Sequence, residues 1–205
     1  MSFFVKKSDI ISSLVIGEAA ALLMIGIGRN VAWPERAAAF LPSLPFFFPF
    51  FTLAVMVAGA LASRLAPFLY QLVKFSLVGS LNFLIDLGVL NLFITLTGVS
   101  QGFFAGTFKA AAFLVAMVSS LLWNKLWTFN ATSVENAGRQ FFQFFLVTSV
   151  GFLINVGVFM LVNDYVGPYA AIDPKTWASV SAAGAAAVGL GWNFLGYRFL
   201  VFRKS

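Results

Sequence analysis

Apolar residues fill this chain in long runs, and short polar stretches separate the runs. Six of the runs are long enough to cross a bilayer, because about 20 residues of α-helix cover its roughly 30 Å apolar core. We predict membrane spans at residues 10–28, 37–63, 75–96, 103–123, 140–163 and 176–197. Pro42, Pro45 and Pro49 place the regular helix of the second span from about Phe46 onward. The expected fold class is an all-α integral membrane protein with six transmembrane helices.

The last four spans contain a repeated unit of two helices. Residues 83–89 read FLIDLGV, and residues 152–158, which lie 69 positions later, read FLINVGV. Each copy carries one polar residue in mid-span, Asp86 or Asn155. An even number of helices brings both copies into the membrane from the same side, so we expect a parallel duplicated repeat. Paired helix repeats are typical of transporters with a binding site near the midplane, which favours a carrier over an enzyme.

The repeat divides the sequence into two parts. Residues 1–70 would hold two N-terminal transmembrane helices, and residues 71–205 a four-helix domain with repeats at about 71–130 and 140–203. The N-terminus also resembles a signal peptide, because two lysines and an apolar run precede a small-residue stretch. Glu18 beside that stretch, and the apolar run that continues to Ile27, favour an uncleaved helix.

The composition indicates that the chain belongs in lipid. It is 60% hydrophobic and 10% charged, whereas average soluble domains carry about 25% charged residues. The absence of cysteine and histidine excludes disulfides, thiolate catalysis and the usual metal-ligand sets, so we expect no metal and no cofactor. The net charge of +6 comes from basic residues that flank the helices, which favours anionic membrane lipids over nucleic acid as partners.

The basic residues also predict the orientation of the helices. If the six spans alternate, nine lysines and arginines lie on one side of the membrane and four on the other. The positive-inside rule then places both termini in the cytoplasm and the protein in the cytoplasmic membrane. The nine are Lys6, Lys7, Arg64, Lys74, Lys125, Arg139, Arg198, Arg203 and Lys204, and the four are Arg29, Arg36, Lys109 and Lys175.

A series of short motifs runs through the repeat. The first copy begins with a Lys-Phe pair at Lys74, continues with a Gly-x-x-Asn step that ends at Asn82, and carries the intramembrane Asp86. Each copy ends with a basic residue and an aromatic residue two to four positions later. These motifs resemble those of the GtrA-like family of membrane proteins, and the resemblance covers about residues 72–203.

The resemblance implies translocation of a polyprenyl-phosphate-linked monosaccharide across the cytoplasmic membrane, for cell-surface polysaccharide synthesis or modification. A membrane-associated glycosyltransferase would make this lipid and would be the protein partner. A different hypothesis is a non-transporting anchor or scaffold for such a polyprenyl-phosphate glycosyltransferase. Catalysis by the chain itself is not expected, because no soluble segment is long enough to hold a nucleotide-sugar domain.

Five candidate substrate-binding residues lie toward the predicted cytoplasmic boundary. Lys74, Lys125 and Arg198 are placed to form charge-assisted hydrogen bonds with a substrate phosphate. The same three residues also suit positive-inside anchoring, with their stems in the apolar layer. Asn124 and Asn193 join them because they match polar positions of the family pattern.

Four further candidates lie within the spans. A carboxylate at the depth of Asp86 costs at least about 2.5–3.5 kcal/mol to insert, so we expect it to face the bundle interior, in a functional or a structural role. Asn82 lies one turn earlier on the same face, and this pair would suit sugar hydroxyls or a proton. Asn155 is the counterpart of Asp86 in the second copy. Lys109 is predicted either to pair with Asp86 or to extend to the outer headgroups.

Two other patterns concern packing. Four tryptophans lie near predicted interfaces, as in an aromatic belt: Trp123, Trp127, Trp177 and Trp192. Ser181, Ala185 and Gly189 make one face of the sixth span smooth enough to pack closely against another helix, in this chain or in a second copy. Because six helices enclose little space for a lipid-linked sugar, a homo-oligomer is favoured.

Overall fold

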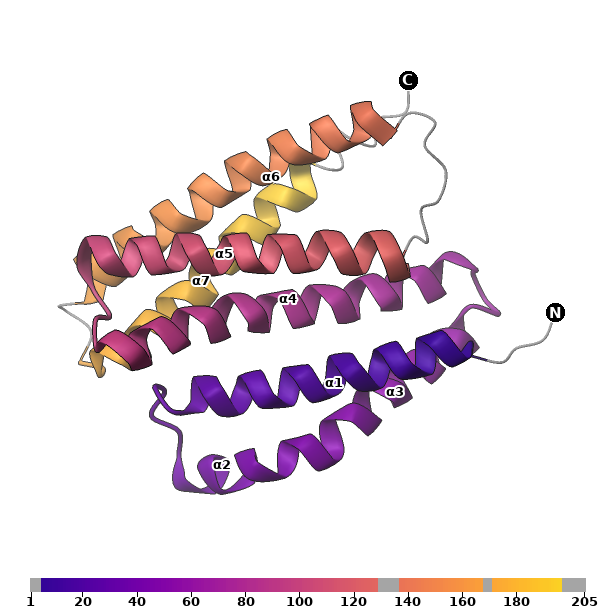
Figure 1. Ribbon diagram of the computed structural model, residues 1–205, viewed down its shortest axis with the longest axis horizontal. Coiled ribbons are helices and arrows are strands. Elements are labelled where there is room, and N and C mark those ends of the chain that lie inside the picture. The colour runs from indigo at the N-terminus through magenta and orange to yellow at the C-terminus, as the bar shows by residue number, and fades with distance from the viewer. Residues whose placement is uncertain (1–4, 129–136, 168–170, 197–205) are drawn as a thin grey trace. The chain divides into compact units, whose positions relative to one another are not determined.

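The computed structural model describes residues 5–128, 137–167 and 171–196, and for residues 137–145, 190 and 193–196 it describes the backbone alone. This described part is helical almost throughout and contains no strand (Figure 1). Its helical elements are α1 (Lys7–Gly28), α2 (Glu35–Phe40), the 3₁₀ turn η1 (Leu41–Ser43), α3 (Leu44–Ala62), α4 (Phe68–Thr97), α5 (Gly102–Trp123), the π-helical segment η2 (Asn124–Thr128), α6 (Ala137–Met160), the π-helical segment η3 (Leu161–Val166) and α7 (Pro174–Gly196).

Five helical stretches of the described chain are long and apolar enough to cross a membrane, and they overlap the first five predicted spans. They are Lys7–Gly28, Glu35–Ala62, Phe68–Thr97, Gly102–Thr128 and Leu146–Val166. The sixth predicted span coincides with α7, whose 23 residues extend over about 34 Å at 1.5 Å per residue. The protein is therefore an all-α integral membrane protein, as the hydropathy pattern predicts.

The second span differs in detail from its prediction. Its regular helix, α3, begins at Leu44 rather than at Phe46, with Pro45 in the first turn and Pro49 inside the helix. A proline in the first turn costs no helical hydrogen bond, because the N–H group there has no partner within the helix. Pro49 removes the bond that its own N–H group would make to the carbonyl of residue 45. The prolines are therefore compatible with a helix that begins at Leu44, and their positions do not identify the first residue of α3.

The contacts divide the chain into two compact units. The first is Met1–Gly88 with Leu114–Ala131, and the second is Val89–Phe113 with Thr132–Ser205. Residues of α4 and of α5 contribute to both units. The domain boundary predicted between residues 70 and 71 is based on the sequence repeat and not on packing. It therefore stays a prediction.

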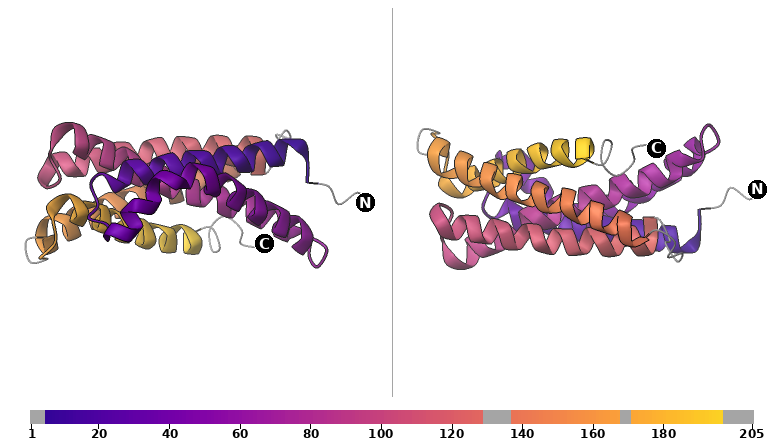
Figure 2. Two further views of the ribbon diagram at one scale, coloured as in Figure 1. Left: turned by 90° about the horizontal axis from the view of Figure 1, so that it is seen from below. Right: turned by 90° about the horizontal axis from the view of Figure 1, so that it is seen from above.

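In the first unit, α1 packs along α3 (Figure 1 and Figure 2). The two helices approach closely at Gly17, where a Cβ atom would lie 2.5 Å from the Cα atom of Pro49. About one turn before Gly17, the carbonyl oxygen of Ser13 accepts a hydrogen bond of 2.8 Å from Thr52 Oγ1. The missing side chain at Gly17 thus permits the crossing at which a hydroxyl of α3 reaches the backbone of α1.

In the second unit, α6 packs along α7 (Figure 1 and Figure 2). A Cβ atom at Gly189 of α7 would lie 3.4 Å from Asn155 Nδ2 of α6, so the helices are in close contact there. Ser181 and Ala185, which precede Gly189 at four-residue spacing, are buried. The smooth face predicted for the sixth span is confirmed, and at Gly189 it packs against a helix of the same chain.

Candidate functional site

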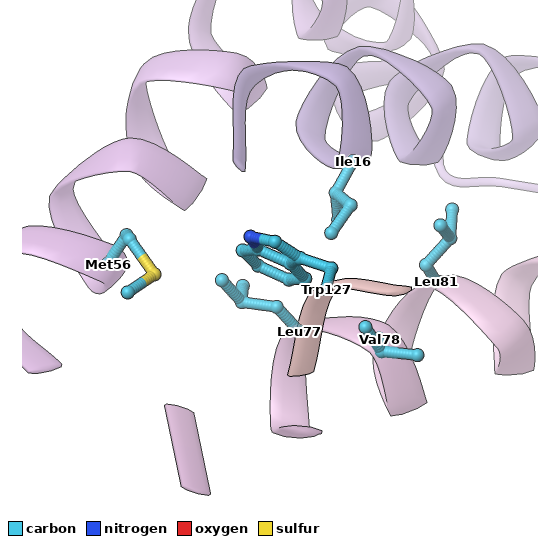
Figure 3. Packing of buried hydrophobic residues seen from close by; sticks show 6 residues of the cluster. All are labelled: Ile16, Met56, Leu77, Val78, Leu81 and Trp127. Atoms are coloured by element: carbon cyan, nitrogen blue, oxygen red, sulfur yellow. The ribbon is translucent and has the colours of Figure 1, made fainter. Parts of the chain in front are cut away.

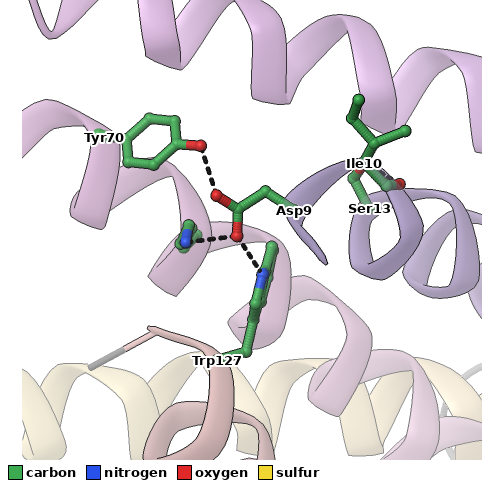
Figure 4. A network of polar contacts seen from close by, with 6 residues as sticks. Asp9, Ile10, Ser13, Tyr70 and Trp127 are labelled. Atoms are coloured by element: carbon green, nitrogen blue, oxygen red, sulfur yellow. Dashed lines mark hydrogen bonds and ion pairs between the residues drawn. The ribbon is translucent and has the colours of Figure 1, made fainter. Parts of the chain in front are cut away.

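One buried carboxylate of the first unit accepts hydrogen bonds from three side chains (Figure 4). Asp9, in the first turn of α1, is only 1% exposed. Its Oδ1 atom accepts a bond of 2.6 Å from Lys74 Nζ and one of 2.8 Å from Trp127 Nε1. Its Oδ2 atom accepts a bond of 2.6 Å from the hydroxyl of Tyr70. We call these four residues the Asp9 cluster, and its short bonds to an ionised group are stronger than neutral hydrogen bonds.

The ammonium of Lys74 is the positive charge of the Asp9 cluster. It lies 4.9 Å from the ring centroid of Tyr70 and 5.2 Å from that of Trp127, within the range of cation–π attraction. Lys74 is buried, and burying a charge is costly unless the charge is paired and hydrogen-bonded. The carboxylate of Asp9 and the two aromatic faces offset that cost. The cluster is therefore an anion-binding arrangement whose anion is a side chain of the same protein.

Local structure around α4 and η2 positions the three donors. Tyr70 and Lys74 are four residues apart, so they lie one turn apart on the same face of α4. Trp127 lies in η2, directly after α5, where its ring belongs to a buried apolar cluster (Figure 3). The other members of that cluster are Ile16, Met56, Leu77, Val78 and Leu81. Because this packing holds the indole ring, its N–H group is fixed in the direction of Asp9.

Two further polar residues lie buried near the middle of α4. Asn82 lies about 12 Å beyond Lys74 along the helix, at 1.5 Å per residue, and is 9% exposed. Neither the nitrogen nor the oxygen of its side-chain amide has a hydrogen-bond partner among the described residues. Asp86, one turn later, is also buried. An unpaired buried polar group costs about 1–3 kcal/mol, so we expect Asn82 to lower the free energy of unfolding.

The second unit has buried polar residues of its own. Lys109 of α5 is 0% exposed, so the alternative in which it extends to the outer headgroups is wrong. Ser179 Oγ of α7 donates a hydrogen bond of 3.0 Å to Asn91 Oδ1 of α4. Asn155 of α6 is buried, and its Oδ1 atom has no partner among the described residues. This unit therefore also holds polar groups among its helices.

Side chains of η3, which follows α6 directly, hold the turn between α4 and α5. Asn163 Nδ2 donates a hydrogen bond of 2.8 Å to the carbonyl oxygen of Ser100, and the N–H group of Gly102 donates one of 2.9 Å to Asp164 Oδ1. Gly98 and Gly102 both have a φ angle of 73°, which glycine adopts without strain. These contacts stabilise the short turn, so the polar groups that form them have a structural role.

The remaining predicted site residues lie at helix ends or beyond the described chain. Lys125 is exposed in η2. Asn124 Nδ2 donates a hydrogen bond of 3.2 Å to Ser120 Oγ, one turn earlier. Asn193 lies in α7 among the residues whose side chains are not described, and Arg198 lies outside the described residues. Of the three predicted phosphate-binding cations, Lys74 is therefore the one that the described structure pairs with an anion.

Sequence reasoning missed three members of the Asp9 cluster. Asp9 precedes the first predicted span and Tyr70 precedes the third, so neither was expected inside the protein. The sequence suggests an aromatic belt for Trp127, whereas in the fold its indole N–H group donates a hydrogen bond to Asp9. One signal was available, because Asp9 is an acidic residue on the side of the membrane where basic residues accumulate. That signal predicts an ion pair but does not identify the cation.

Comparison with known protein families gives one finding that covers most of the repeat region. The family model described as GtrA/DPMS, transmembrane domain, matches residues 74–202, which is more than half of the chain. Searches of curated proteins and of solved structures found no match. The family match confirms the resemblance seen in the sequence motifs. The chain therefore belongs to the GtrA/DPMS transmembrane-domain family, and it is a multi-pass membrane protein tied to polyprenyl-phosphate sugar biosynthesis.

Proposed function

We propose that this protein translocates a polyprenyl-phosphate-linked monosaccharide across the cytoplasmic membrane, for synthesis or modification of a cell-surface polysaccharide. The observation that carries the proposal is the side-chain amide of Asn82, which is buried near the middle of α4 without a partner among the described residues. A sugar hydroxyl both donates and accepts hydrogen bonds, so it would satisfy either atom of this amide. Polar residues at such depth typically mark the path of a substrate.

The second repeat supports the proposal with an equivalent residue. Asn155 corresponds to Asp86 in the repeated sequence, lies buried in α6 and has an Oδ1 atom without a partner in the described structure. Each repeat thus contributes a polar side chain within its first helix. Transporters built from repeated helix pairs commonly bind substrate near the bilayer midplane with residues from both halves.

The proposal also includes an orientation of the protein in the membrane and its partners. The excess of basic residues on one side favours both termini in the cytoplasm. A membrane-associated glycosyltransferase would supply the lipid-linked sugar, and the chain itself would perform no chemical step. A homo-oligomer would enlarge the space that six helices enclose.

Translocation is tested with the purified full-length chain reconstituted into lipid vesicles. A short-chain prenyl-phosphate sugar is placed in one leaflet, and its appearance in the other leaflet is followed with time. We expect faster appearance than in protein-free vesicles, because buried polar groups lower the barrier for moving a sugar through the apolar core. Vesicles that hold an unrelated six-helix membrane protein control for general disturbance of the bilayer.

The same measurement separates translocation from the anchor hypothesis. A non-transporting anchor for a polyprenyl-phosphate glycosyltransferase predicts that the enzyme co-purifies with this chain while the lipid crosses no faster than in protein-free vesicles. That pair of results would overturn the proposed translocation.

A further inference from the structure

The anion and the donors of the Asp9 cluster come from different parts of the chain. Lys74, Tyr70 and Trp127 belong to α4 and η2, whereas Asp9 belongs to α1. The family match covers residues 74–202, so it includes Lys74 and Trp127, whereas Tyr70 and α1 lie outside it. Without the carboxylate of Asp9, one ammonium, one hydroxyl and one indole N–H group would remain directed at a common point (Figure 4).

A phosphodiester resembles the carboxylate of Asp9 in its charge and in the hydrogen bonds that it accepts. Each group carries one negative charge on two equivalent oxygen atoms, and each accepts short charge-assisted hydrogen bonds. In Asp9, Oδ1 accepts bonds from two donors and Oδ2 accepts a bond from the third. Two non-bridging phosphate oxygens would accept the same three bonds.

Local structure permits Asp9 to leave the cluster without separation of α1 from α3. Asp9 lies in the first turn of α1, and Lys6 at the N-cap position makes no side-chain capping bond. The close crossing at Gly17 lies two turns further along α1. Uncapped terminal turns open at a lower free energy than the packed interior of a helix. Opening the first turn would therefore expose the three donors and leave the helix pair in place.

We propose that Lys74, Tyr70 and Trp127 form a binding site for the phosphate of a prenyl-phosphate lipid, and that Asp9 occupies this site until the lipid displaces it. The N-terminal helix then regulates the family domain by an internal anion that competes with the substrate. The proposal rests on the proposed function for the identity of the lipid. Its test measures binding alone, so failed binding and failed translocation are separate results.

Equilibrium binding to the full-length protein in detergent tests the competition. The probe is a short-chain prenyl methyl phosphate, which carries the phosphodiester without a sugar. Asp9→Asn is expected to bind the probe at least about tenfold more tightly than the wild type, because the site is no longer occupied by a competing carboxylate for most of the time. Asp9→Asn with Lys74→Gln is expected to lose this gain, since the cation that binds the phosphate is gone.

Matched controls assign the effect to the site and to the lipid. Lys7→Gln removes an exposed cation near Asp9 and is expected to bind as the wild type does. The corresponding prenyl alcohol, inorganic phosphate and phosphatidylglycerol are titrated in parallel. The proposal requires the gain for the prenyl phosphodiester. An equal gain for the alcohol, for free phosphate or for phosphatidylglycerol would overturn it.

The outcome does not depend on whether Asp9→Asn folds alone. The double variant Asp9→Asn with Lys74→Gln leaves no unpaired charge buried. Its affinity for the phosphodiester relative to the alcohol is compared with that of the wild type. We expect the wild type to show this preference and the neutral double variant to lose it. The proposal is overturned if the double variant keeps the wild-type preference, or if a folded Asp9→Asn protein shows no gain in affinity. Asp9 would then serve only to hold α1 against α4 and η2.

Discussion

Replacing Lys74 by alanine is expected to lower the free energy of unfolding by about 3–5 kcal/mol, the cost of removing one partner from a buried ion pair. Lys74 Nζ lies 2.6 Å from Asp9 Oδ1, and both residues are buried. Without the ammonium, the carboxylate of Asp9 would stay in apolar surroundings with two neutral donors, from Tyr70 and Trp127. The loss is measured by unfolding the protein in mixed detergent micelles.

Two comparison variants identify the cause of that loss. Asp9→Asn with Lys74→Gln removes both charges and is expected to cost less than Lys74→Ala, because no single charge remains buried. Lys7→Ala removes an exposed cation and is expected to change stability by less than about 0.5 kcal/mol. A loss equal to that of Lys7→Ala would show that the ion pair does not stabilise the fold.

Gly17→Ala is expected to lower the free energy of unfolding by about 1–3 kcal/mol, the usual cost of inserting a methyl group into a filled space. The new Cβ atom would clash with Thr52 Oγ1 and would lie 2.5 Å from the Cα atom of Pro49. A backbone atom cannot move aside as the end of a side chain does, so α1 and α3 must separate. Separation also lengthens the hydrogen bond from Thr52 to the Ser13 carbonyl. Unfolding in mixed micelles measures this loss as well.

Gly26→Ala in the same helix is the matched control for Gly17→Ala. A Cβ atom at Gly26 would meet nothing within 4 Å. Alanine favours the helix over glycine by up to about 1 kcal/mol, so this variant is expected to be as stable as the wild type or more stable. Equal losses at the two positions would mean that the crossing of α1 and α3 is not close at Gly17.

Hydropathy predicts the helices of this protein because membrane spanning is a local property. A run of about 20 apolar residues must form a helix in lipid, whatever the rest of the chain does, since its backbone groups find no water. The predicted start of the fourth span at residue 103 therefore lies within one residue of the start of α5 at Gly102. The boundaries of α3 are less well predicted, because prolines are compatible with the first turn of a helix as well as with a loop.

The Asp9 cluster was not predictable in the same way, because it depends on contacts between distant residues. Asp9 is 65 positions from Lys74 and 118 positions from Trp127 in the sequence. Hydropathy places each residue at a depth in the membrane, but it does not state which helices are neighbours. The sequence therefore predicts that Lys74 binds a substrate phosphate or anchors the helix, whereas in the fold it forms an ion pair with the carboxylate of Asp9.

The sequence predicts burial of Asp86 and leaves Lys109 either paired with Asp86 or extended to the headgroups, but it does not predict the hydrogen-bond partners of the mid-span polar residues. Asn82, Asp86, Lys109 and Asn155 are all buried, as the cost of exposing polar groups to lipid requires. The sequence did not indicate that both amide atoms of Asn82 would lack partners, because satisfaction of a hydrogen bond depends on the neighbouring helix. The unpaired amide of Asn82 is expected to cost stability, whereas the proposed function uses it to bind a sugar.

Replacing Asn82 by leucine tests the central claim, that this buried amide serves the passage of a sugar. Leucine has a similar size and no polar atoms, so the variant is expected to be as stable as the wild type or more stable. Translocation of a short-chain prenyl-phosphate sugar in vesicles is nevertheless expected to slow at least about tenfold, which corresponds to about 1.4 kcal/mol in the barrier.

Ser80→Ala is the matched control for this measurement, because Ser80 is an exposed polar residue of the same helix, only two positions away. Both variants are reconstituted at equal amounts, and the rate of transfer between leaflets is compared with that of the wild type. The account predicts a wild-type rate for Ser80→Ala and a slow rate for a stable Asn82→Leu protein. A wild-type rate for Asn82→Leu would contradict it.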